Sequence, residues 1–97
     1  MANGNLTLKI PPGLPDDVED WDEDDDEVFL GENKTEYHLK EAHIQTIKDQ
    51  EVCGMHLLDF EPRYLISGGM TLGGAYSICT LVRVLKVAKG LIAGPGK

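Results

Sequence analysis

The sequence is poor in cysteine, in aromatic residues and in positive charge. Its 97 residues include two cysteines, and aromatic residues make up 6% of the chain. Cys53 and Cys79 are too few for a disulfide framework, so free thiols are expected. Lysine and arginine number 9 against 17 aspartate and glutamate residues, which gives a formal net charge of −8. Acidic segments repel phosphates, so direct nucleic-acid binding by the acidic part is not expected.

Long hydrophobic runs are also missing. No apolar run approaches the roughly 20 residues that a membrane-spanning helix needs. The first ten residues, MANGNLTLKI, lack the apolar stretch of a secretory signal peptide. We therefore expect an intracellular protein without a membrane span. Two matches to the N-glycosylation pattern, at Asn5 and Asn33, are interpreted as chance because no export signal accompanies them.

The charges are divided unevenly along the chain. All 17 acidic residues lie at or before Glu61, and with four lysines they give residues 1–61 a net charge of −13. Residues 62–97 contain five basic residues and no acid, for a net charge of +5. This asymmetry predicts that the two parts attract each other or that each meets a different partner.

Residues 16–27, which we call the acidic tract, dominate the first part. The tract reads DDVEDWDEDDDE, with ten acidic positions out of twelve. Its charges repel one another and cannot be buried unpaired, which predicts a solvated arm. The arm would bind a basic protein partner, with Trp21 as an apolar anchor. The residues expected to bind that partner are Asp16, Asp17, Glu19, Asp20, Trp21, Asp22, Glu23, Asp24, Asp25, Asp26 and Glu27.

Two simpler interpretations of the tract stay open. The arm alone keeps the protein soluble, as long runs of like charge often do. The second concerns Trp21, which in this interpretation folds back onto the protein's own core instead of anchoring a partner. A calcium-binding loop is a poorer match, because the spacing that begins at Asp20 places Asp25 and Gly31 where glycine and glutamate are required.

Alternating or β-rich stretches predict short strands at 5–10, 35–48, 52–60 and 64–66. Pro62 and the glycines separate them as breakers and turns. The fold class predicted from this pattern is α+β, with a small antiparallel β-sheet and one C-terminal amphipathic helix. Residues 1–28 are expected to form an N-terminal strand and a flexible acidic arm, and residues 29–97 a single small folded domain.

The last third of the chain carries the helical pattern. Its apolar residues fall on one side of a helical wheel, opposite Arg83 and Lys86. Many β-branched residues raise its strand propensity, so an all-β fold with this segment as a strand is the alternative. The apolar side is expected to make a homo-oligomer, with self-association through Ile78, Leu81, Leu85, Ala88 and Ile92.

No motif predicts a catalytic residue, a metal site or a cofactor. Cys53 and His56 have metal-ligand spacing, and His38 and His43 precede them, but the usual paired spacing is missing. Cys53 beside His56 would suit nucleophilic catalysis only if a third group oriented the histidine. The glycine pairs lack the rest of a phosphate-binding loop and are interpreted as turns.

Three functions follow from these patterns. The first is a non-enzymatic acidic binding protein that engages a basic protein, as a chaperone or an inhibitor of a nucleic-acid-binding protein would. The alternative is a precursor peptide, in which an acidic leader precedes a cationic amphipathic segment released by cleavage after Gly69 or Gly74. The third is an enzyme or metalloprotein that uses Cys53 and the histidines.

Overall fold

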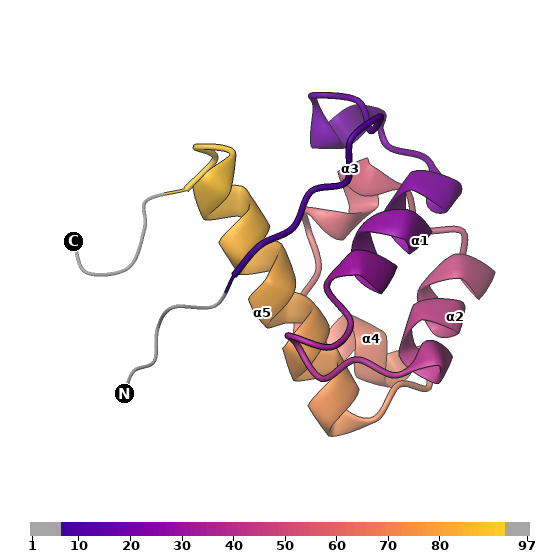
Figure 1. Cartoon of the computed structure of the whole chain (residues 1–97). Helices are drawn as coiled ribbons and strands as arrows, with labels where there is room; N and C mark the ends of the chain where they lie inside the picture. Colours follow the sequence, from indigo (N-terminus) through magenta and orange to yellow (C-terminus); the bar gives the residue numbers. More distant parts are fainter. Residues whose placement is uncertain (1–6, 93–97) are drawn as a thin grey trace, which may run out of the picture.

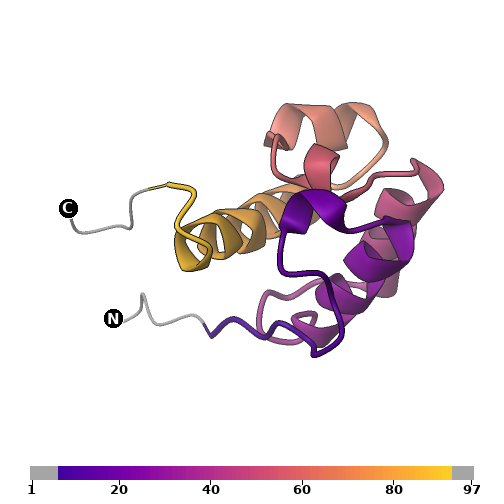
Figure 2. The ribbon, with the colours of Figure 1, turned by 90° about the horizontal axis from the view of Figure 1, so that it is seen from above.

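The computed structural model describes residues 7–92, and every regular element in this range is helical (Figures 1 and 2). The predicted antiparallel sheet is therefore wrong, and so is the all-β alternative. One turn of 3-10 helix precedes five α-helices. These elements are η1 (Val18–Asp20), α1 (Glu23–Glu32), α2 (Glu41–Asp49), α3 (Gly54–Leu57), α4 (Pro62–Ser67) and α5 (Leu72–Ala88).

The segment 35–48, predicted as one strand, contains two different structures. Its first part lies in turns and loop, and a helix begins at Glu41. From there His43, Ile44 and Ile47 are buried on one side of α2, which is the spacing of an amphipathic helix. Because the pattern was interpreted across the boundary, neither the helical nor the strand period fitted the whole stretch.

The strands predicted at 52–60 and 64–66 are also helical. The first contains α3, and the second lies within α4. Pro62 occupies the first turn of α4, where a missing N–H costs no intrahelical hydrogen bond and the fixed φ favours the helix. The proline therefore begins a helix, whereas its interpretation as a breaker predicted the end of a strand.

The predicted C-terminal helix is confirmed as α5. Thr71 caps its N-terminus by accepting a hydrogen bond from the amide of Gly74 through its hydroxyl, at 3.2 Å. Ile78, Leu81 and Leu85 are fully buried along one side. The β-branched residues cost the helix little, because burial of a full apolar side outweighs intrinsic propensity.

The acidic tract supplies η1 and the first half of α1, so the boundary predicted after residue 28 falls inside a continuous helix. Asp22 caps α1 by accepting from the amide of Asp25 at 2.9 Å, and Asp25 accepts from the amide of Asp22 at 3.1 Å. Carboxylates in the first turn also interact favourably with the positive end of the helix dipole. The tract is thus part of the folded body.

The N-terminal strand predicted at 5–10 is not formed by residues 7–10, and residues 5 and 6 lie outside the described range. This segment is bound by Asn33, which is fully buried at the end of α1. The Asn33 side chain accepts from the amide of Lys9 at 2.9 Å and donates to the carbonyl of Lys9 at 2.8 Å. It also donates to the carbonyl of Phe29 at 2.9 Å, so its amide group is well satisfied.

Candidate functional site

The exposed part of the acidic tract forms one continuous stretch before and at the start of α1. Asp16, Asp17, Glu19, Asp20 and Asp22 are exposed and make no ion pair with the lysines and arginines of residues 7–92. We call these five residues the acidic face. Their carboxylates reach solvent, so their charge is available to a cationic partner.

Two other acids of the tract are paired within the molecule. Lys48 on α2 lies 2.9 Å from a carboxylate oxygen of Glu27 and 3.8 Å from one of Asp24. These contacts connect α1 to α2. At the other end of the tract, Lys89 donates a hydrogen bond to the backbone carbonyl oxygen of Asp16 at 2.8 Å. This bond does not involve the Asp16 carboxylate.

Trp21 is not an exposed anchor, because only 1% of it is accessible to solvent. Its indole N–H donates to the carbonyl oxygen of Pro15 at 2.8 Å. Its ring centroid lies 5.1 Å from that of Phe29 on α1, within the range of favourable aromatic pairs. The interpretation in which Trp21 folds onto the core of the protein is therefore the one that the structure supports.

Asp26 also lies inside the molecule rather than on the acidic face. It is fully buried, and neither carboxylate oxygen has a hydrogen-bond partner among the described residues. Burial, and then the nearby Asp25, Asp22 and Glu23, raises the pKa of Asp26 from 3.8 to about 8. The raised pKa favours the protonated form of Asp26, and its burial keeps its carboxyl group away from a partner.

The residues predicted to mediate self-association are mostly in the core. Ile78, Leu81 and Leu85 are fully buried within the chain itself, and only Ala88 and Ile92 are exposed. Three of the five residues of the predicted interface therefore lie inside the folded chain and are not available on its surface. Amphipathic spacing identified the buried side of α5 correctly, but it cannot distinguish a core from an interface.

The candidate metal ligands do not gather at one place. Within residues 7–92, no group of three or more histidine, cysteine, aspartate or glutamate side chains is arranged to hold a metal ion. Cys53 and His56 do meet, with Sγ 3.3 Å from Nδ1. His43 is buried between α2 and α5, where Nδ1 accepts from the amide of Lys40 at 3.1 Å and Nε2 lies 3.3 Å from the Thr71 hydroxyl.

The two glycines proposed as cleavage points lie in different environments. Gly69 is exposed after α4 and has a φ of +102°, a conformation that favours glycine. Gly74 is buried in the first turn of α5, where an added Cβ would lie 2.5 Å from Nε2 of His43. The glycine at this position allows the histidine ring to approach the helix backbone closely.

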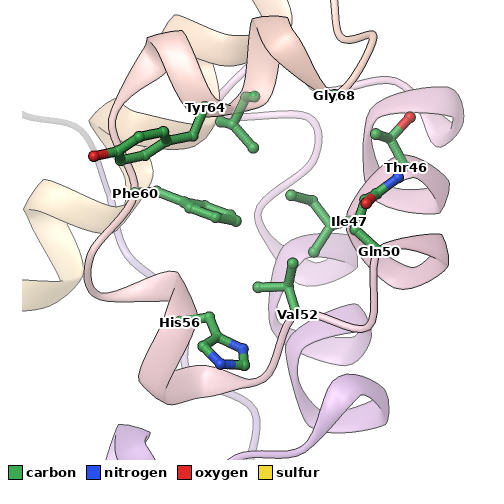
Figure 3. Close-up of a pocket in the computed structure, with 9 residues that line it drawn as sticks. Thr46, Ile47, Gln50, Val52, His56, Phe60, Tyr64 and Gly68 are labelled. Atoms are coloured by element: carbon green, nitrogen blue, oxygen red, sulfur yellow. The ribbon is translucent and has the colours of Figure 1, made fainter.

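A groove lies between α2 and the segment that contains α3 and α4 (Figure 3). Ile47, Val52 and Leu65 are buried at its base, and Phe60 and Tyr64 stand along one side. Its volume is about 300 Å³. Sequence reasoning missed this groove, because its residues come from segments that were interpreted as separate strands.

The comparisons agree with this helical architecture. No curated protein and no solved structure matches the chain. No helix among residues 7–92 has the length and apolarity required to cross a membrane. A family model described as a SAM-like domain, which is an all-helical fold, matches residues 5–84. Because this match covers most of the sequence, the chain belongs to the SAM-like domain family.

Proposed function

We propose that this chain is a protein-interaction module whose acidic face binds a basic protein surface. The observation that carries the proposal is the exposure of five carboxylates that make no ion pair within residues 7–92, at Asp16, Asp17, Glu19, Asp20 and Asp22, on a folded support. Membership of the SAM-like domain family supports an interaction role, since such domains are usually interaction modules.

The fixed geometry of the acidic face favours binding over mere solvation. Asp17 precedes the 3-10 turn η1 and Asp20 is its last residue, while Val18 in the same turn is buried. Asp22 is held by its hydrogen bonds at the start of α1. Side chains on an ordered backbone lose less conformational entropy on binding than those of a disordered arm. A partner that binds nucleic acid through the same basic surface would be shielded by this face.

The test is the affinity for a fluorescently labelled oligolysine peptide, measured by anisotropy at low and at high salt. Binding by charge predicts an affinity that falls steeply with salt, because exposed charges are screened over about 8 Å at physiological ionic strength. The variant Asp17→Asn/Glu19→Gln/Asp20→Asn should bind at least about tenfold more weakly, with a smaller salt dependence.

The matched control is Glu32→Gln/Glu36→Gln/Glu41→Gln, which removes the same amount of charge from exposed positions outside the acidic face. It should retain most of the affinity. Equal losses in both variants would show that net charge alone matters, and the proposed role of this face would be wrong.

A further inference from the structure

The groove between α2 and the α3–α4 segment is a hollow that opens to solvent above buried apolar side chains. Phe60 points into the space, and Ile47 and Val52 lie across from it (Figure 3). Tyr64 is 52% exposed at the edge. An aromatic side chain left exposed beside an apolar hollow is typical of a surface that binds a partner.

The size of the groove limits what it can hold. A volume of about 300 Å³ is at the lower end of the range for small-molecule sites, about 300–1,000 Å³. It suits one large apolar side chain of a protein segment better than an extended ligand. Interfaces commonly place such an anchor in a well-packed hollow of this kind.

Acidic residues adjoin two of the groove residues in the chain. Gln50 lines the groove between Asp49 and Glu51 in the chain, and Phe60 lines it between Asp59 and Glu61. All four acids are exposed. Glu61 is paired with Arg63 at 3.0 Å, and the Arg63 guanidinium also lies 5.2 Å from the centre of the Tyr64 ring. Among the described residues, the acids beside the groove that make no ion pair are Asp49, Glu51 and Asp59. Lys48 contacts Glu27 on α1. The charge around the apolar base therefore favours a cationic partner.

We propose that this groove binds one large apolar side chain from a protein segment in which lysine or arginine flanks that side chain. The inference rests on the proposed function in one respect, because both require a basic partner. The surface is separate from the acidic face and shares no residue with it. His56 and Gln50 at the groove supply polar groups for the backbone of the segment, and Nδ1 of His56 is already engaged by Cys53.

The test uses three labelled peptides of equal length. One is lysine-rich with a central tryptophan, one is the same peptide with a central alanine, and one is glutamate-rich with a central tryptophan. The native domain should bind the first at least about tenfold more tightly than the second, because binding transfers the tryptophan side chain from water into the apolar groove. It should bind the third weakly or not at all.

Two substitutions test the groove itself. Both are at exposed positions that are not part of the buried core. Tyr64→Ser removes an exposed ring from the edge, and Gln50→Trp fills the space from the end of α2. Both should abolish the preference for tryptophan over alanine. The matched control is Tyr76→Ser, which removes a ring 56% exposed on α5 outside the groove and should keep the preference.

The outcomes separate this inference from the proposed function. Equal affinity for the two lysine-rich peptides would contradict binding in the groove and would not affect the proposal for the acidic face. A preference that survives both groove substitutions, or tight binding of the glutamate-rich peptide, would also overturn it. If neither lysine-rich peptide binds, both proposals are wrong. Self-association that Tyr64→Ser abolishes, without any peptide preference, would identify a second copy as the occupant and contradict the proposal.

Discussion

The amide of Gly54 donates a hydrogen bond to the carbonyl oxygen of Trp21 at 2.9 Å. This contact joins the start of α3 to the acidic tract and brings the two backbones close together. A Cβ atom on Gly54 would lie 1.8 Å from the carbonyl oxygen of Val18 and 2.9 Å from Cβ of Trp21. The glycine is therefore required by space, because neither neighbouring group is the flexible end of a side chain.

Gly54→Ala should destabilise the domain by about 1–3 kcal/mol or more, since the backbone around Val18 has to move. Chemical denaturation by urea measures the loss. Gly31→Ala is the control, because a Cβ at Gly31 in α1 meets nothing within 4 Å. That change should be neutral or stabilise the helix by up to about 1 kcal/mol. A stable Gly54→Ala variant would contradict the close approach of α3 to the tract.

Asp26→Asn should stabilise the domain, and the gain should grow with pH. The pKa of Asp26 in the folded state is raised to about 8, so between about pH 4 and pH 8 the folded chain retains a proton that the unfolded chain releases. Stability in the native sequence therefore falls as pH rises through this window. Asparagine carries no charge at any pH and avoids that loss.

The measurement is urea unfolding of Asp26→Asn and of the native sequence at about pH 5 and about pH 8. The difference in unfolding free energy should increase over this interval, by up to about 1.4 kcal/mol per pH unit. Glu36→Gln, at an exposed position, is the control and should show a small, nearly constant difference. A pH-independent gain in Asp26→Asn would mean that Asp26 is not a buried acid.

Trp21, the only tryptophan of the chain, should report folding and not partner binding. Its burial predicts blue-shifted fluorescence in the native state, weak quenching by acrylamide and a red shift on unfolding. Trp21→Ala should cost about 3–5 kcal/mol, as truncation of a large core residue does. Native emission typical of exposed tryptophan would overturn the packing of the tract described above.

Thr71→Ala should destabilise the domain by about 0.5–2 kcal/mol, because the Thr71 hydroxyl caps α5 and lies 3.3 Å from Nε2 of His43. Thermal unfolding followed by circular dichroism measures the effect. Thr35→Ala, at an exposed turn position, is the control. Thr71→Ser keeps the hydroxyl and should retain most of the native stability. If Thr71→Ala is as stable as the native sequence, the Thr71 hydroxyl does not stabilise α5 as a cap.

The sequence predicted one part of the fold well. The wheel that begins near Ile78 places Leu81 and Leu85 on the same side, and all three are buried in α5. Helical spacing over a long segment is a strong signal. It does not tell a core from an interface, so the predicted self-association through these residues did not follow from it.

Helix α1 escaped sequence reasoning for a physical reason. Its buried positions are Asp26, Phe29, Leu30 and the following Asn33, which have helical spacing. Two of the four are polar, however, and the rule that charges stay outside removes Asp26 from the pattern. A carboxyl whose pKa rises on burial is neutral, and a sequence alone gives no sign of that change.

The short helices and the groove could not be predicted from the sequence pattern, for a different reason. Helix α3 has 4 residues and α4 has 6, so both are too short to repeat an apolar position over several turns. The groove exists only because Ile47, Phe60 and Leu65 are brought together by the packing of these helices. Long-range proximity of this kind is set by tertiary contacts, which local propensity does not encode.

One cluster of buried side chains runs from Val18 near the start of the described chain to Leu85 near its end. During synthesis on the ribosome, α5 is the last of these helices to be made. Until it emerges, the earlier apolar residues have no complete core to enter and are exposed to aggregation. The same nascent segment carries the high negative charge of the first 61 residues, and mutual repulsion keeps nascent chains apart. The acidic tract is thus expected to protect the chain before it folds as well as to present a surface afterwards.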